Sequence, residues 1–173
     1  MKKPHLLLTT EEEDQDWAAV IDTPFGKLGI KTAEYENSLM LKEIFYVSKD
    51  TPLLKPKNHL AKTAIQQIQA YLKNPDYIFD LPMIPQGTVF QQKVWSNISS
   101  IPLGKALTYG DLAKKIKSGP RAIGGACGAN PFPLIVPCHR VVSATGIGGF
   151  ARQDEEGYHR NIKTWLLHHE GVL

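Results

Sequence analysis

The second half of the chain contains the stretch TYGDLAKKIKSGPRAIGGACGA at residues 108–129, which predicts two short helices joined by a tight turn. Thr108 and Asp111 have the spacing of a capping box, in which side chains satisfy free N–H groups at a helix start. Pro120 suits the first position of the second helix, where its missing N–H group costs nothing. Two helices with so short a connection match the helix-turn-helix pattern, although many helical proteins share it.

The helix expected at residues 120–129 contains three glycines. Each glycine costs roughly 1 kcal/mol relative to alanine inside a helix, and such a cost is retained where the backbone must come close to something else. Cys127 would face inward, whereas Arg121, Gly124 and Gly128 share another face. A small-residue face with a single arginine suits a groove of nucleic acid, and tight packing against another helix explains it equally well.

The first half of the chain has the pattern of a small sheet followed by one helix. Strands are expected at residues 17–22, 27–31 and 39–47, the last with a comparable helix propensity. The first two strands flank the turn Thr23-Pro24-Phe25-Gly26. Apolar residues then recur at helical spacing over residues 60–73, and residues 81–85 form an extended linker.

Residues 88–96 predict a helix that Thr88 caps, and a rigid loop follows at residues 130–133. Taken together, these elements predict an α+β protein. The first domain, with its linker, is expected at residues 1–84 and is a small strand-rich α/β module. The second domain is expected at residues 85–173 and is mostly helical.

The composition excludes several classes of protein. A chain of 173 residues with 42% hydrophobic and 21% charged residues is typical of a globular protein, and not of a disordered chain, a collagen-like repeat or a coiled coil. The first 84 residues carry 10 Lys, no Arg and 12 acidic residues, whereas the rest carry 6 Lys, 4 Arg and 5 acidic residues. Any site for a phosphate-bearing partner is therefore expected in the second half.

The cysteine usage and the N-terminus point to an intracellular, cytoplasmic protein. Cys127 and Cys138 are the two cysteines, too few for a disulfide framework or a zinc cluster, and no metal site is expected. The N-terminal apolar run is just Leu6-Leu7-Leu8, so neither a signal peptide nor a membrane span is expected.

The stretch PCHRVV at residues 137–142 places Cys138 beside His139 at the end of an apolar run. Such a cysteine is a candidate nucleophile, because the thiolate reacts and a histidine can take the proton. A free thiol has a pKa of about 8.5 and is mostly protonated at pH 7. The apolar Val136 and Pro137 would raise that pKa further. A Cys-His pair alone is more often an inert buried thiol.

These residues lie in a longer stretch that resembles the O6-alkylguanine-DNA alkyltransferases, also called methylated-DNA–protein-cysteine methyltransferases. The matching segments follow the family's order and cover nearly all of residues 86–171. They are Gly87-Thr88-Val89-Phe90-Gln91, Val94-Trp95, Ile101-Pro102-Leu103-Gly104, Thr108-Tyr109, Leu112-Ala113, Arg121-Ala122-Ile123-Gly124, Asn130-Pro131, Pro137-Cys138-His139-Arg140-Val141, Lys163, Trp165-Leu166-Leu167 and His169-Glu170-Gly171. The N-terminal half matches in outline, mainly at residues 23–26 and 79–82.

The resemblance implies a DNA repair protein that takes an alkyl group from O6 of guanine, and from O4 of thymine, in duplex DNA onto Cys138. The transfer is irreversible, each molecule acts once, and no cofactor is required. The implied first domain is RNase H-like, and the second carries the helix-turn-helix. Duplex DNA is the expected partner, and we expect a monomer because transfer is stoichiometric.

The resemblance also assigns the catalytic residues. His139 would take the proton from Cys138 through a bridging water, because the side chains of adjacent residues diverge. Glu170 would orient His139 and stabilise its charged form. Asn130 corresponds to the family's hinge residue, which ties the helix-turn-helix to the active-site loop.

Further residues are assigned to the DNA and to the damaged base, which must leave the stack before it can react. Tyr109 would push on the phosphate beside the target and donate a hydrogen bond to the base, and Arg121 would fill the vacated space. The residues expected in the minor groove beside Arg121 are Ala122, Gly124 and Gly128. Those expected to line the base pocket are Pro133, Val141 and Tyr109.

The segment at residues 151–160 departs from the family, which has a short loop with adjacent glycines there. This segment is longer and more charged, which leaves the preference among alkyl groups open. Outside these roles, Arg140 is expected in a buried ion pair and Cys127 as a packing residue. Two other functions stay open: a damage sensor that binds alkylguanine without repairing it, and a thiol hydrolase, for which an adjacent Cys-His pair is poor geometry.

Overall fold

The computed structural model describes residues 16–148 and 157–173. Contacts divide the chain into two compact units, one comprising residues up to Ile68 with Asp80–Ile84, and the other comprising Gln69–Phe79 with Pro85–Leu173. The chain crosses between the two units after Ile68, after Phe79 and after Ile84. The division into domains at residues 1–84 and 85–173 stays a prediction. Residues 69–79, which precede that boundary in sequence, pack with the second unit.

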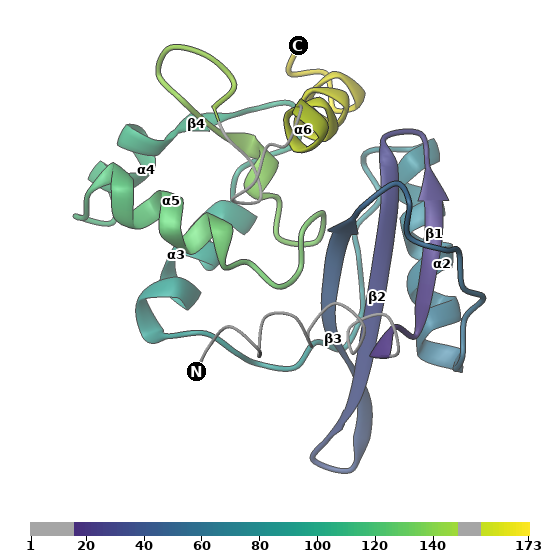
Figure 1. The fold of residues 1–173 in the computed structure, drawn as a ribbon. Helices are drawn as coiled ribbons and strands as arrows, with labels where there is room; N and C mark the ends of the chain where they lie inside the picture. Colours follow the sequence, from purple (N-terminus) through teal and green to yellow (C-terminus); the bar gives the residue numbers. More distant parts are fainter. Residues whose placement is uncertain (1–15, 149–156) are drawn as a thin grey trace, which may run out of the picture. The chain divides into compact units, whose positions relative to one another are not determined.

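The first unit is built on an antiparallel sheet of three strands in the order β1-β2-β3 (Figure 1). The strands are β1 (Ala19–Thr23), β2 (Gly26–Tyr35) and β3 (Ser38–Val47). All three predicted strands are confirmed, and so is the turn between the first two, where Thr23 pairs with Gly26. Between β2 and β3, Glu36 and Asn37 both have positive φ, 48° and 67°. Two such residues form the turn whose twist matches that of a hairpin.

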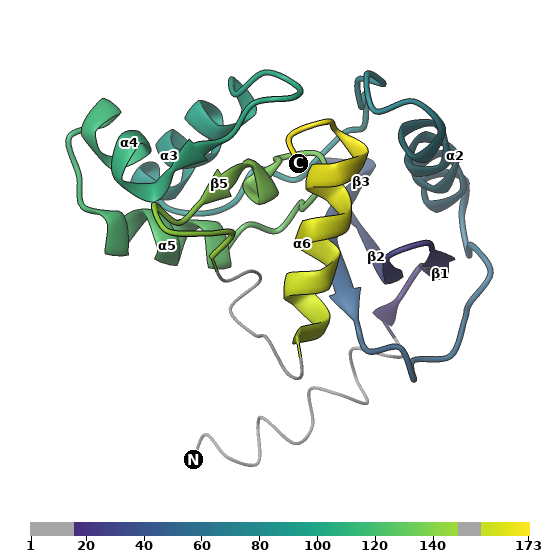
Figure 2. The ribbon, with the colours of Figure 1, turned by 90° about the horizontal axis from the view of Figure 1, so that it is seen from above.

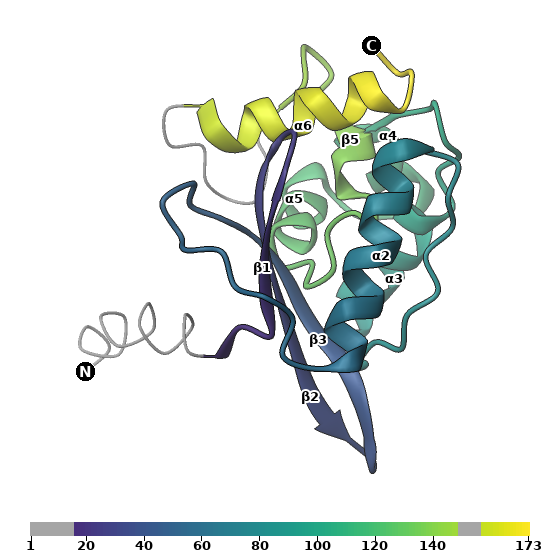
Figure 3. The ribbon, with the colours of Figure 1, turned by 90° about the vertical axis from the view of Figure 1, so that its right-hand side faces the viewer.

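Helix α2 (His59–Lys73) follows the sheet, and Figures 1 and 3 show it running alongside the strands. Asn58 begins it, since its Oδ1 accepts a hydrogen bond from the Ala61 N–H at 2.8 Å. Apolar residues of β2 and β3 and every third or fourth residue of the helix form the core of this unit: Leu28, Ile30, Leu41, Ile44, Ala61, Ala64 and Ile68. The predicted helix is thus confirmed, and its apolar stripe covers the sheet.

The second unit is mostly helical. Its elements are α3 (Val89–Ser99), β4 (Leu107–Thr108), α4 (Tyr109–Lys115), α5 (Pro120–Gly128), the single 3₁₀ turn η1 (Cys138–Arg140), β5 (Val141–Val142) and α6 (Tyr158–His169). Strands β4 and β5 pair in parallel, and in Figure 2 β5 lies between the group α3–α5 and helix α6. The core brings the helices together with the cysteine segment: Val94, Ile98, Ile101, Leu112, Ala113, Ile116, Ile123, Ala126, Cys138 and Val141.

Two threonines begin helices of this unit as predicted. Thr88 forms a full capping box with Gln91, in which each side chain accepts a hydrogen bond from the other residue's backbone N–H. The Thr108 hydroxyl accepts the Asp111 N–H at 3.0 Å and so caps α4. Four residues separate α4 from α5, and Lys117 among them has a left-handed φ of 58°. The expected pair of short helices is present, and its use as a helix-turn-helix on DNA stays a prediction.

One prediction about the segment at residues 151–160 is wrong in part. Tyr158–Arg160 belong to α6, which begins after Gly157 in the left-handed region at φ 76°. Arg152 lies outside the described residues. Among the residues that the structure describes, no helix combines the length and apolarity required to cross a membrane.

Candidate active site around Cys138

Cys138 begins the turn η1 and is buried, with 5% of its surface exposed. Asn130 holds the segment that leads to it. The Asn130 Nδ2 group donates to the Val136 carbonyl at 2.9 Å and to Cys138 Sγ at 3.2 Å, and its Oδ1 accepts the Phe132 N–H at 2.9 Å. Inside this loop, Leu134 has a φ of 80°, which is strained for a bulky side chain. Asn130 therefore connects the end of α5 to the thiol, where the sequence placed a hinge.

The thiol of Cys138 is protonated at neutral pH. A hydrogen bond with the Cys127 thiol and burial raise its pKa well above the usual range, and the Asn130 amide and nearby Lys163 only partly oppose them. The sequence predicted the effect of burial but treated Cys127 as a packing residue. Cys127 is half-buried on α5 and packs against the core as expected, and in addition its thiol is a hydrogen-bond neighbour of that of Cys138.

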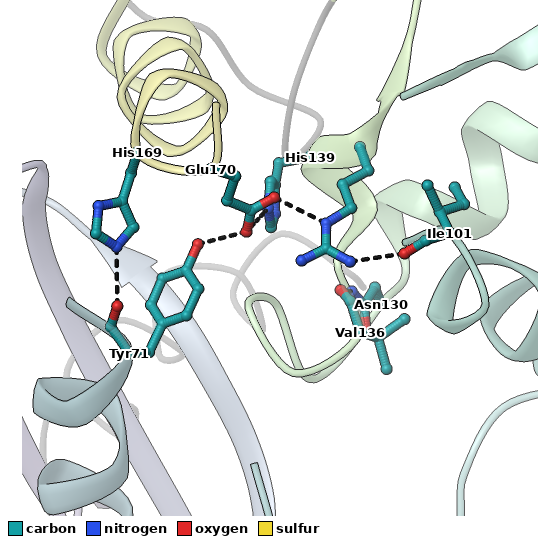
Figure 4. Close-up of polar contacts among 8 residues, drawn as sticks. Tyr71, Ile101, Asn130, Val136, His139, His169 and Glu170 are labelled. Atoms are coloured by element: carbon teal, nitrogen blue, oxygen red, sulfur yellow. Dashed lines mark hydrogen bonds and ion pairs between the residues drawn. The ribbon is translucent and has the colours of Figure 1, made fainter. Parts of the chain in front are cut away.

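His139 and Glu170 form a buried pair in which the orientation of the imidazole is fixed. His139 is 1% exposed, and its Nε2 lies 2.8 Å from Glu170 Oε2 (Figure 4). Because an ionised carboxylate only accepts hydrogen bonds, Nε2 carries the proton and Nδ1 keeps its lone pair. Nδ1 is buried and has no hydrogen-bond partner among the described residues. Burial lowers the pKa of His139, so that the imidazole is neutral and free to accept a proton.

Three side chains donate to the Glu170 carboxylate. Oε2 accepts from His139 and from the Tyr71 hydroxyl, at 2.8 and 2.5 Å, and Oε1 accepts from Arg140 Nε at 2.8 Å. Burial would raise the pKa of Glu170, but these hydrogen bonds lower it to about 2, so the carboxylate stays charged. Arg140 also donates to the Ile101 carbonyl at 2.7 Å, which confirms the expected buried ion pair.

Lys163 stands inside the same unit with no exposed surface. Its Nζ donates to the Val141 carbonyl at 2.8 Å and lies 5.7 Å from the centre of the Tyr109 ring. Burial lowers the pKa of Lys163 to about 8, and burial raises that of Tyr109 to about 12. Lys163 belongs to the matching residues of the sequence, but no role was predicted for it. Its position on the apolar stripe of α6, beside Ile162 and Leu166, is the signal that indicates a buried cation.

The residues expected to contact DNA lie on the outer surface of α5. Arg121 and Ala122 are exposed, and Gly124 and Gly128 are half-buried. A methyl group built on Gly124 or on its neighbour Gly125 would meet no protein atom within 4 Å. Tight packing within the chain therefore does not explain these two glycines. The contact of this face with DNA stays a prediction.

The two other residues expected in the base pocket differ in exposure. Pro133 is half-buried, whereas the Val141 side chain is fully buried in the core. The backbone carbonyl of Val141 accepts the hydrogen bond from Lys163. Hydrogen bonds thus join Cys138 to Asn130 and His139 to Glu170, and the backbone from Cys138 to His139 connects the two pairs. Lys163 lies over the Tyr109 ring beside them.

Comparison with known proteins agrees with this geometry. Residues 89–172 match the family model described as 6-O-methylguanine DNA methyltransferase, DNA binding domain. A probable methylated-DNA–protein-cysteine methyltransferase of Acanthamoeba polyphaga mimivirus is 37% identical over 147 residues, which are 83% of this chain and 91% of that protein. A methylated-DNA–protein-cysteine methyltransferase of Shigella flexneri is 33% identical over 159 residues, which are 89% and 88% of the two chains.

Solved structures give the same result for the fold. The crystal structure of Mycobacterium tuberculosis OGT in complex with DNA is 33% identical, with a TM-score of 0.69 over 88% of this chain and 91% of that chain. The O6-methylguanine DNA methyltransferase of Methanococcus jannaschii is 26% identical, with a TM-score of 0.58 over 89% and 93%. Both the mixed α/β architecture and the resemblance read from the sequence are confirmed. This chain belongs to the family of methylated-DNA–protein-cysteine methyltransferases.

Proposed function

We propose that this protein repairs duplex DNA by taking the alkyl group from O6 of guanine onto Cys138 Sγ. A bond forms between sulfur and the alkyl carbon, and the bond from that carbon to O6 breaks. The thioether is stable, so each molecule acts once and no cofactor takes part. The observation that carries this proposal is the buried lone pair of His139 Nδ1, which the Glu170 carboxylate fixes on the residue that follows Cys138 in the chain.

The thiol proton must leave Cys138 before the alkyl group arrives. A water between Cys138 and Nδ1 relays the thiol proton to the neutral imidazole, and Glu170 stabilises the imidazolium that forms. The Asn130 amide, 3.2 Å from Sγ, stabilises the thiolate as it appears. The electron pair of the broken bond goes to the guanine, where Tyr109 donates a hydrogen bond and buried Lys163 supplies positive charge nearby.

Access to O6 requires the damaged nucleotide to leave the base stack. We assign the outer face of α5 to the minor groove, with Arg121 filling the vacated space and Ala122, Gly124 and Gly128 beside it. Open space outside Gly124 supports this assignment. Helices α4 and α5 then act as the helix-turn-helix, and DNA binding weakens as salt rises.

The remaining predictions complete the proposal. Residues 85–173 form the DNA-binding and catalytic domain, extended by the segment 69–79 that packs with it. Pro133 and Tyr109 line the base pocket, and O4-alkylthymine is a second substrate. The protein works as a monomer in the cytoplasm.

The test is intact-protein mass spectrometry after incubation with duplex DNA that contains one O6-methylguanine. Repair predicts a mass gain of one methyl group per molecule and no gain for Cys138→Ala. Binding without a mass change would instead identify a damage sensor. Turnover of an ester or amide without the mass gain would identify a thiol hydrolase.

A further inference from the structure

Tyr71 is a buried side chain of the site that lies outside the segment matched by the family model. It belongs to the last turns of α2, precedes the family match at residues 89–172, and is 2% exposed. Its hydroxyl donates to Glu170 Oε2 at 2.5 Å, across 99 positions of sequence. Oε2 is the oxygen that also accepts His139 Nε2, so phenol and imidazole share one acceptor (Figure 4).

The phenol is held in place by the end of α6. His169 Nε2 donates to the Tyr71 carbonyl at 2.8 Å, and the His169 ring meets the Tyr71 ring edge-on at 5.1 Å. Trp165 stacks on the other side of His169 at 4.8 Å, and Phe79 packs against Tyr71 at 5.7 Å. Figure 4 shows Tyr71 joined at its backbone to His169 and at its hydroxyl to Glu170. His169, the last residue of α6, thus binds the backbone of Tyr71, and Glu170, the C-cap of that helix, binds its hydroxyl.

We propose that Tyr71 is a positioning residue of the alkyl transfer, whose hydroxyl sets how strongly Glu170 attracts the proton on His139. This proposal rests on the proposed function. A hydroxyl that donates to a carboxylate disperses its negative charge, and such charge-assisted bonds are about twice as strong as neutral ones. With Tyr71 in place, Glu170 orients the imidazole without raising its basicity as far as an unshared carboxylate would. His139 then stays neutral in the resting protein and is free to accept the thiol proton.

The charged and titratable groups around this contact define the variant that tests it. Arg140 and Lys163 face the His139–Glu170 pair, and His169 faces the Tyr71 ring. Tyr71→Phe leaves all of them and the ring packing in place and removes one oxygen. Tyr77→Phe is the matched control, because Tyr77 is half-buried nearby in sequence and packs its ring on Phe79.

The experiment measures the single-turnover rate of methyl transfer from duplex DNA against pH, with DNA in excess. The rate constant then refers only to the molecules that react, and the final extent of methylation gives the fraction of molecules that are folded and active. Removing the phenol strengthens the hold of Glu170 on the proton and raises the pKa of His139. Because the base must be neutral, we expect the acid limb of the Tyr71→Phe profile to move to higher pH by about one unit. Rates fall about tenfold below the midpoint and recover above it.

A purely structural role for Tyr71 would slow transfer equally at all pH values, and an unmoved acid limb would overturn the proposal. Tyr77→Phe should keep the profile of the unaltered protein. In a Glu170→Gln background the shift caused by Tyr71→Phe should vanish, and a persisting shift contradicts the proposal. Failure of the proposed function looks different, since then no variant gains a methyl group.

A measurement on the unaltered protein covers the case in which Tyr71→Phe does not fold. Proton NMR of protein with labelled tyrosine should show one strongly deshielded, slowly exchanging hydroxyl proton, assigned to Tyr71 by its ring contacts with Phe79 and His169. A freely exchanging Tyr71 hydroxyl overturns the proposal.

Discussion

Replacing Gly124 or Gly125 by alanine should make the protein more stable and at the same time a poorer DNA binder. Both glycines lie inside α5, and a methyl group at either position meets no protein atom within 4 Å. Each substitution therefore gains the full difference in helix propensity, about 1 kcal/mol, without a steric penalty. For a chain of this size that corresponds to a rise in melting temperature of about 2–4 °C.

The same methyl group projects from the face that we assign to the minor groove. There it separates the helix from the sugar-phosphate backbone, so DNA affinity should fall several-fold while stability rises. Fluorescence anisotropy with a labelled duplex at fixed salt measures the affinity, and calorimetry measures the melting temperature. Ser96→Ala in α3 is the control, because this exposed helical position also gains helix propensity but lies on another helix.

Two results would refute this reasoning. A fall in melting temperature would mean that the glycines have a packing role inside the chain after all. Unchanged DNA affinity in the stabilised variants would remove α5 from the interface.

Three further variants test the contacts around the thiol. Asn130→Ala removes the hydrogen bonds to Cys138, Val136 and Phe132, so we expect slower methyl transfer and a free energy of unfolding lower by about 1–3 kcal/mol, measured in urea; an unchanged rate contradicts the role of the amide. Glu170→Gln removes a carboxylate whose pKa is about 2 in the folded protein and 4.5 in the unfolded chain. This difference contributes about 3 kcal/mol to the free energy of unfolding above pH 4.5, and the contribution is lost as the pH falls toward 2. The stability gap between Glu170→Gln and the unaltered protein should therefore narrow over that window, and a constant gap contradicts it. Cys127→Ala removes the thiol that raises the pKa of Cys138, so transfer at pH 7 should quicken; a slower rate in a folded variant would show that Cys127 assists the reaction.

The elements that follow from local chemistry could be predicted from the sequence. Thr88 and Thr108 cap helices because the acceptor and the N–H it satisfies are three residues apart. The thiol, its histidine and the glutamate were identified through a resemblance, and the structure adds why they work together. Arg140 could be assigned to an ion pair because its segment is otherwise apolar.

The missed features depend on distant contacts or on single backbone angles. Tyr71 and Glu170 are 99 positions apart, and nothing around Tyr71 distinguishes it from an apolar helix residue. Cys127 and Cys138 are 11 positions apart, and the loop that Asn130 holds lies between them. The first turn of α6, Tyr158–Arg160, falls within the segment expected as a loop, because the polar residues before it continue into the helix and the left-handed Gly157 has no unique sequence signature.

Cys138, and not the neighbouring thiol of Cys127, is the acceptor of the alkyl group in the proposed reaction. The direct test is peptide mapping by tandem mass spectrometry after reaction with duplex DNA carrying a labelled O6-methyl group. Cys127 and Cys138 are neighbours in the structure, but only Cys138 is followed in the chain by His139, the residue that pairs with Glu170. We predict that all of the label resides on Cys138, in an amount equal to the protein, and that Cys127→Ala leaves the yield unchanged. Label on Cys127, or methyl transfer that persists in Cys138→Ala, would contradict the account.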